Sequence, residues 1–177
     1  EFDHASGLLE EAVRLAEAAD DRECLATSLN DLGLAVKGCG DAERATALLE
    51  RALMLFRHMG NQAQAARALN NLGVNLLYGG DPARAQPMFA EALRVHRALG
   101  DRPGTAATLN NLAQVAQAAD EAESAFALYL ESYAVAREAS VYPYAAIARE
   151  NAAALARERG DLRFADEAYR ESLDLNL

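Results

Sequence analysis

Basic side chains are scarce in this chain of 177 residues. Lysine and arginine number 17 against 27 aspartates and glutamates, which leaves a net charge of −10 at pH 7. A surface that binds nucleic acid needs an excess of basic side chains to neutralise phosphates. The charge balance therefore argues against direct nucleic-acid binding by this segment. The acidity would suit a basic partner, although the need for solubility explains it as well.

Cysteine is equally rare, and the two examples are Cys24 and Cys39. The periodicity described below places them near opposite ends of one helix, roughly 22 Å apart, which is beyond the reach of a disulfide. Free thiols favour a reducing compartment, so we expect a cytoplasmic protein. No apolar run approaches the ~20 residues of a membrane span and no signal peptide is visible, so no association with a membrane is expected.

Motifs for catalysis, metal binding and phosphate binding are missing as well. His4, His58 and His96 lie far apart, without HExxH or a comparable ligand spacing. No phosphate loop of the form GxxxxGKS/T occurs, and the glycine pairs have the positions of helix ends. We therefore expect no enzymatic activity and no bound cofactor or metal.

The chain is rich in internal repetition. The sequence LNNLG, residues 69–73, lies within ARALNNLGVNLLYGGDPARA, residues 66–85. Similar stretches are ATSLNDLGLAVKGCGDAERA, residues 26–45, and AATLNNLAQVAQAADEAESA, residues 106–125. A degenerate fourth copy, AIARENAAALARERGDLRFA, covers residues 146–165. Self-similarity at one fixed period is the signature of a stacked-repeat protein.

Each repeat has the pattern of two helices. Over residues 22–37, leucines and a valine recur at helical spacing. Gly40 then suits the left-handed position that ends a helix, and Asp41 suits the cap that begins the next one. The sequence therefore predicts an all-α fold, a right-handed α-solenoid of about nine antiparallel helices. Its core is expected along two columns, Leu32/Leu72/Leu112 and Ala45/Ala85/Ala125/Ala165.

The repeat boundaries predict one solenoid over residues 1–177. It would consist of a half repeat (1–20), three full repeats (21–60, 61–100 and 101–140) and a near-complete repeat (141–177). Because both ends interrupt a repeat, we expect a fragment of a larger protein. The terminal helices should expose apolar side chains that invite self-association. These side chains are Leu8, Leu9, Val13, Tyr169 and Leu173.

These repeats resemble the tetratricopeptide pattern, in which W-x2-L-G-x2-Y is followed by A-x3-F and a proline. The second copy reads Leu69-x2-Leu72-Gly73-x2-Leu76, followed by Ala85-x3-Phe89. The period here is about 40 residues instead of 34. The closing proline is replaced by Arg57, Arg97 and Arg137, so each second helix should continue further.

The long variant, with its ALxNLG, GDxxxA and LGDR-type sequences, is similar to the repeats of large bacterial regulators of the LuxR, AfsR and maltose-regulator types. It also resembles kinesin light chain and the mitotic-spindle adaptors, which bind extended peptides. The resemblance implies a protein or peptide partner, or a small effector, bound by a signalling or transcriptional regulator. The alternative is a structural module that self-associates without a separate ligand.

Asparagines recur inside the first helix of each repeat, although asparagine is a mediocre helix former. One column is Asn30, Asn70 and Asn110; the next is Asp31, Asn71, Asn111 and Asn151. In tetratricopeptide folds the first helices line a concave groove, where amides can hold an extended peptide backbone. We assign this role to the second column, and hydrogen bonding between repeats to the first; inter-repeat bonding by both columns is the alternative. The predicted groove residues are Asp31, Arg67, Asn71, Val74, Tyr78, Asn111, Gln114 and Asn151.

Overall fold

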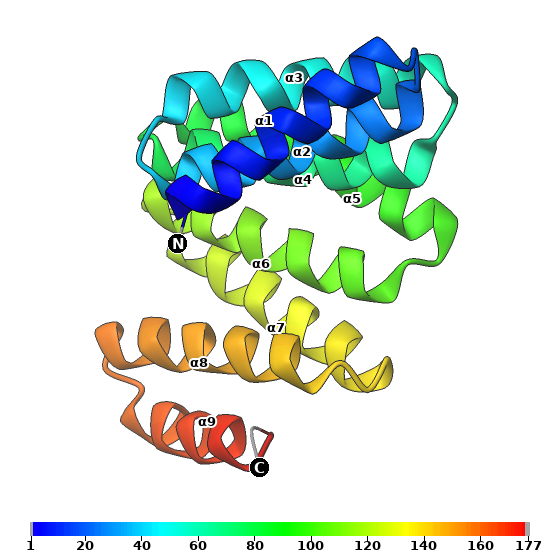
Figure 1. Ribbon diagram of the computed structural model, residues 1–177. Helices are drawn as coiled ribbons and strands as arrows, with labels where there is room; N and C mark the ends of the chain where they lie inside the picture. Colours follow the sequence, from blue (N-terminus) through cyan, green and yellow to red (C-terminus); the bar gives the residue numbers. More distant parts are fainter. Residues whose placement is uncertain (1, 176–177) are drawn as a thin grey trace. The chain divides into compact units, whose positions relative to one another are not determined.

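The computed structural model describes residues 2–175, and the helices in this part of the chain number nine, with no strand among them. The all-α prediction is confirmed. Short turns join the helices, which Figure 1 labels in chain order. Their bounds are α1 (Phe2–Ala18), α2 (Arg22–Gly38), α3 (Ala42–His58), α4 (Gln62–Tyr78), α5 (Pro82–Leu99), α6 (Arg102–Ala118), α7 (Ala122–Glu138), α8 (Tyr142–Glu158) and α9 (Leu162–Leu175).

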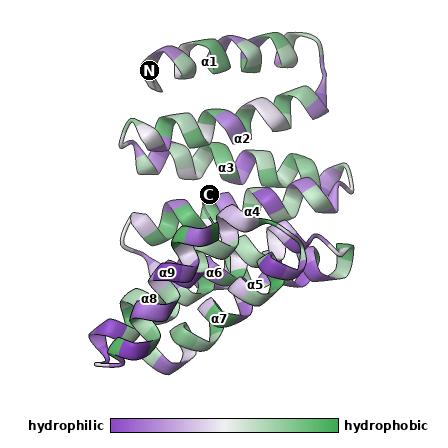
Figure 2. Ribbon diagram, turned by 90° about the horizontal axis from the view of Figure 1, so that it is seen from below, coloured by the Kyte–Doolittle hydropathy of each residue, from purple (hydrophilic) through white to green (hydrophobic). Residues whose placement is uncertain are grey.

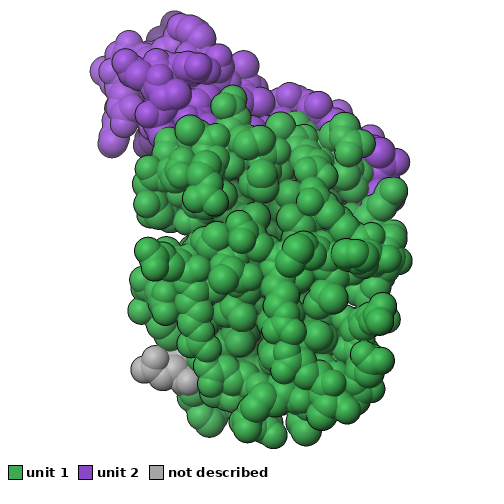
Figure 3. Space-filling model, turned by 90° about the horizontal axis from the view of Figure 1, so that it is seen from above, with its two compact units in different colours: residues 1–95 green, residues 96–177 purple. Residues whose placement is uncertain are grey.

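The helices form two compact units, coloured separately in Figure 3. Unit 1 covers residues 1–95 and contains α1 to α4 with most of α5. Unit 2 covers residues 96–177 and contains the last turn of α5 with α6 to α9. In each unit, helices that follow one another along the chain pack together, for example α1 on α2 and α8 on α9.

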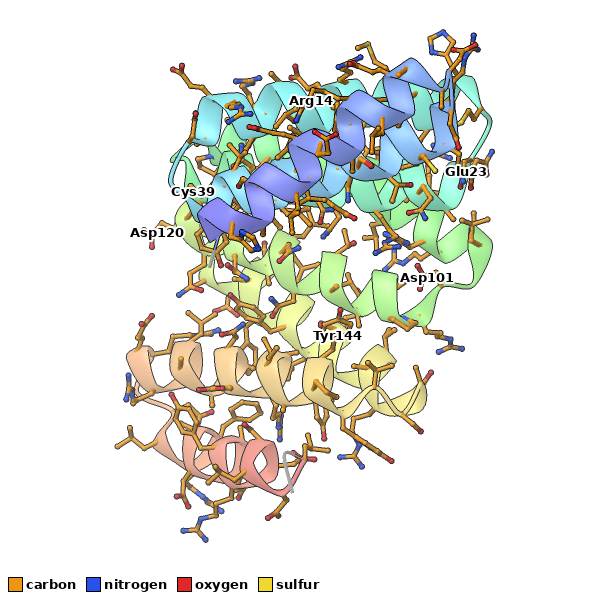
Figure 4. All side chains as sticks on the ribbon, in the orientation of Figure 1. Arg14, Glu23, Cys39, Asp101, Asp120 and Tyr144 are labelled. Carbon is orange, nitrogen blue, oxygen red and sulfur yellow. The ribbon has the colours of Figure 1, made fainter. Side chains whose placement is uncertain are left out.

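A left-handed residue ends each of the first eight helices, at intervals of 20 residues. Five of these residues are glycines, as the sequence predicts, and the others are Asp20, Asp120 and Ser140. Asp120, labelled in Figure 4, has a φ of 61° and takes the place that glycine holds elsewhere. Aspartate tolerates this conformation because its short polar side chain can bond locally. The three turns without glycine therefore have the same left-handed backbone conformation as the five turns with it.

Side-chain caps begin most of the helices. The carboxylate of Asp41 accepts a hydrogen bond from the backbone N–H of Arg44 at 3.0 Å, and Asp101 accepts one from Gly104 at 2.9 Å. Such caps satisfy backbone donors that have no partner within the helix. Together, a left-handed end and a capped start confine each reversal of the chain to a few residues.

One hydrophobic cluster of unit 1 lies between α1, α2 and α3. Leu32, Val36 and Ala45 are buried there, and the half-buried Leu9 and Val13 pack against them. The expectation that Leu9 and Val13 are exposed is therefore wrong, because α2 and α3 cover that side of α1. In Figure 2, hydrophobic and hydrophilic bands alternate along α1, as expected of a helix with one buried side.

Glycines inside the first helices allow the second helices to approach closely. A Cβ atom at Gly73 would lie 2.7 Å from the ring of Phe89, and one at Gly33 would lie 2.8 Å from Leu49. Both distances are shorter than real Cβ contacts. Glycine at these positions therefore makes room for a large side chain from the facing helix.

Unit 2 fills the corresponding space differently. Alanine replaces glycine at Ala113, and the larger Tyr129 packs against it with Ala116, all three fully or almost fully buried. The alanine column is buried throughout the chain, with exposures of 0, 0, 0 and 4% at Ala45, Ala85, Ala125 and Ala165. The leucine column is buried at Leu32 and Leu72, whereas Leu112 is only half-buried.

Replacing Gly73 by alanine tests the close approach. The added Cβ would collide with the Phe89 ring, so Gly73→Ala should destabilise the protein by about 1–3 kcal/mol through overpacking. The control is Gly7→Ala in α1, where nothing lies within 4 Å of the added atom. That change should stabilise the protein by roughly 0.5–1 kcal/mol, because alanine is the better helix former. Urea unfolding measures both, and equal effects of the two variants would refute the packing argument.

Candidate functional site

The first helices of neighbouring repeats lie in contact within each unit, α2 with α4 in unit 1 and α6 with α8 in unit 2. Within each unit, the sides of these two helices that carry the asparagine columns form what we name the first-helix face of that unit. In unit 1 this face carries Asp31 on α2 and Arg67, Asn71, Val74 and Tyr78 on α4. In unit 2 it carries Asn111 and Gln114 on α6 and Asn151 on α8.

The asparagines of unit 1 form a chain of hydrogen bonds. The amide nitrogen of Asn71 donates to the side-chain oxygen of Asn30 at 3.0 Å, which joins α4 to α2. Asn30 is only 8% exposed, and its amide nitrogen donates to the carboxylate of Asp31 at 3.1 Å. The second column of one repeat therefore bonds to the first column of the repeat before it.

Unit 2 contains the same link. The amide nitrogen of Asn151 donates to the side-chain oxygen of Asn110 at 2.9 Å and joins α8 to α6. We call these bonds the amide ladder. Each of its amides, at Asn71 and Asn151, uses one N–H to hold the neighbouring repeat. Their half-buried side-chain oxygens accept no hydrogen bond from the described residues. The ladder thus ties neighbouring repeats together within each unit and leaves two amide oxygens without a donor among the described residues.

The predicted neighbours of Asn71 line the same side of α4. Arg67 and Tyr78 are exposed, Tyr78 to 68%, and Val74 is half-buried. The ammonium group of Lys37, on α2, lies 5.2 Å from the centre of the Tyr78 ring, a cation–π distance. Burial lowers the pKa of this lysine. Unit 1 therefore brings a cation, an aromatic ring and an amide together on one face.

Arginine–glutamate pairs cross between the second helices. Arg57 of α3 pairs with Glu91 of α5 at 2.8 Å, and Arg97 of α5 pairs with Glu131 of α7. These arginines replace the closing proline of the usual repeat. Exposed pairs of this kind stabilise little individually, about 0–1 kcal/mol each. Because the pairs recur at the repeat period, they nevertheless align each second helix with the next second helix.

The third such glutamate, Glu171 of α9, belongs to a denser cluster. Its carboxylate accepts hydrogen bonds from the Tyr133 hydroxyl, from Arg137 at 3.0 Å and from Nε of Arg149 at 2.8 Å. The Arg149 guanidinium also lies 5.0 Å from the Tyr133 ring centre and 4.6 Å from that of Phe164. One carboxylate therefore joins α7, α8 and α9, and we name these five residues the Glu171 cluster.

The cluster shifts the ionisation of its members. Burial alone would raise the pKa of Glu171, but the hydrogen bond from Tyr133 and the charges of Arg149 and Arg137 outweigh it and lower the pKa. Burial raises the pKa of the Tyr133 hydroxyl, and the bond to Glu171 adds to the increase. At neutral pH the cluster therefore holds an ionised glutamate and a neutral tyrosine.

The described residues contain no group of three or more potential ligands that could hold a metal ion. Within the same part of the chain, every helix is too short or too polar to span a bilayer.

Sequence comparison identifies the repeats. A family model of the Tetratricopeptide repeat matches residues 64–138 and 105–176, and a second model with the same description matches residues 25–58. The chain belongs to the tetratricopeptide repeat family. The comparison with curated proteins finds no relative.

Solved tetratricopeptide-like structures share this fold. BtubC (BKLC) from P. vanneervenii is 20% identical, with a TM-score of 0.82 over 99% of this chain and 73% of that one. A kinesin light chain with nearly identical TPR-like repeats from Podosopora anserina is 17% identical, with a TM-score of 0.76 over 99% and 87%. A Rap protein complexed with Competence and Sporulation Factor is 16% identical, with a TM-score of 0.88 over 98% and 49%. At these identities the likeness shows the fold alone.

Two features of this tetratricopeptide array were not predicted from the sequence. The first is Tyr144, labelled in Figure 4, which lies on α8 with an exposure of 39%, on the same side as Asn151 and as Ile147, which is 48% exposed. The Glu171 cluster was missed because Arg149 was read only as part of a degenerate repeat. Its signal was available: residue 149 falls in the column of Leu29, Leu69 and Leu109, where an arginine needs an explanation.

The amide ladder predicts coupling between Asn30 and Asn71. Asn71→Ala leaves the buried oxygen of Asn30 without a donor, so it should destabilise the protein by roughly 0.5–2 kcal/mol. The double variant Asn30→Ala/Asn71→Ala removes both partners, so its loss should be smaller than the sum of the two single losses. Thermal or urea unfolding of the four proteins measures the coupling. Strictly additive losses would show that the ladder does not join the repeats.

Proposed function

We propose that this segment is a non-catalytic binding module that holds a protein or peptide on the first-helix face of its units. The observation that carries the proposal is the amide ladder. Asn71 and Asn151 each use one N–H to hold the neighbouring repeat, and the side-chain oxygen of each accepts no hydrogen bond from the described residues, so a partner can donate to it. An extended peptide presents backbone N–H groups, and one of these can pair with the acceptor that each unit provides.

Side chains beside the ladder can supply specificity. In unit 1, Tyr78 and Arg67 stand exposed on either side of Asn71 along α4. In unit 2, Tyr144 and Ile147 present apolar surface beside Asn151. Exposed aromatic and arginine side chains are the types that contribute most at binding surfaces. A peptide held by its backbone on one unit would therefore be selected by how its side chains fit the two exposed residues of that unit.

The proposed setting is a bacterial signalling or transcriptional regulator, in which the repeats sense a protein, a peptide or a small effector. The long repeat with its LGDR-type junction supports this setting. A Rap protein with the same fold was solved in complex with Competence and Sporulation Factor, which agrees with a sensing role. The match to this chain covers 49% of the length of that Rap protein.

Selection from a random peptide display library, followed by titration of the selected peptides, tests the binding proposal. Tyr78→Ala and Arg67→Ala should weaken binding by about 1–3 kcal/mol each if these residues contact the peptide, with melting temperatures unchanged because both side chains are exposed. Met54→Ala, at a position 56% exposed on α3, is the control on a second helix. Peptides that lose affinity for the Met54 variant alone, or for none of the variants, would refute the first-helix face.

Self-association is the second candidate, and exposed leucines favour it. Leu8 and Leu15 lie on one side of α1 with exposures of 62 and 61%, and Leu173 on α9 is 66% exposed. Of the other predicted contacts, Tyr169 is half-buried. Light scattering coupled to size exclusion, from micromolar to millimolar concentration, should show dimers that Leu8→Ser/Leu15→Ser abolishes. A mass that stays monomeric throughout would eliminate this candidate.

A further inference from the structure

The last described helix, α9, buries few large side chains. Its buried residues are Ala165, Ala168 and Ser172, which offer little apolar area. Phe164 is only half-buried, and both Leu162 and Leu173 are mostly exposed, at 65 and 66%. The hydrophobic contribution to docking scales with apolar area, so packing holds this helix weakly.

Apolar contacts of α9 include the Phe164 ring, whose centre lies 5.1 Å from that of Phe126 on α7, and Leu175, which packs against buried alanines of α6, α7 and α8. The Glu171 cluster adds the charged contacts. Tyr133 and Arg137 donate from α7, and Arg149 donates from α8, all to the one carboxylate of Glu171. Hydrogen bonds to ionised groups are stronger than neutral ones. The attachment of α9 to α7 and α8 therefore depends unusually on a single charged side chain.

Arg149 increases the dependence of α9 docking on the Glu171 carboxylate. The corresponding residues of the other repeats, Leu29, Leu69 and Leu109, are 0, 1 and 0% exposed. Arg149 thus stands in a core column, where its side chain is 15% exposed between two aromatic rings. A charge in such a place is tolerated while it has its counter-charge and is strongly unfavourable once that partner is removed.

We propose that α9 is a conditionally docked helix. It stays on α7 and α8 only while the Glu171 carboxylate is ionised and available to Arg149. When this carboxylate is neutralised or drawn away, the guanidinium of Arg149 loses its counter-charge and must be hydrated. The helix α9 then detaches from α7 and α8 as a unit. Leaving uncovers Leu155 and Ala152 of α8, which lie in the core cluster that Phe164 covers. The rest of unit 2 stays folded, because α6, α7 and α8 pack on one another independently of α9.

Hydrogen exchange of the full chain at neutral pH tests the proposal. Glu171→Gln keeps the size of the side chain and removes its charge. Amides of α9 should then exchange at least about tenfold faster, while those of α6 and α7 change little. Glu131→Gln is the matched control, because Glu131 pairs with Arg97 at the same place one repeat earlier, where the core column holds Leu109. It should leave exchange in every helix nearly unchanged.

A second variant separates the buried arginine from a general loss of stability. Arg149→Leu in the Glu171→Gln background restores the leucine column and removes the uncompensated charge, so protection of α9 should return. Unchanged exchange of α9 in Glu171→Gln would overturn the proposal. Equal acceleration in all helices of unit 2, loss of fold, or failure of Arg149→Leu to restore protection would overturn it too.

Discussion

The close contact between the two helices of each repeat is the constraint on which the other features depend. A column of alanines, buried from Ala45 to Ala165, lies at this contact in all the repeats. Side chains this small let two helices approach closely, and glycine at Gly33 and Gly73 brings them closer still. In each tight pair, the side of the first helix that faces away from the second helix carries the asparagines. The candidate binding surface therefore follows from how the pairs pack.

Much of the fold could be predicted because the same sequence pattern occurs in several copies. A glycine, or a residue in its place, followed by an aspartate marks most of the turns, and four copies of one pattern show which positions must be buried. The exposure of Leu9 and Val13 was predicted wrongly, because the repeat pattern does not tell which side of a terminal helix its neighbours cover. Leu112 shows a similar limit: a column defined by sequence does not specify how well the facing residue fills the space.

The candidate site was less accessible to prediction. The sequence places Asn71 and Asn30 in separate columns, but their bond joins residues 41 apart, so it depends on the offset between neighbouring first helices. No periodic pattern contains that offset. The role of Arg149 depends on three helices meeting at one carboxylate. Its presence in a leucine column is visible in the sequence, but its partners become clear only when α7, α8 and α9 are placed in space.

The uniform length of the helices restricts how such a chain can change during evolution. All but two of the helices have 17 residues, and a left-handed residue follows each of the first eight at the same interval. One residue inserted into a helix would turn every later side chain of that helix by about 100°. The alanine column would then leave the contact, and the asparagines would leave the ladder. Insertions should consequently accumulate in the turns, and the array should lengthen or shorten only by duplication or loss of whole repeats.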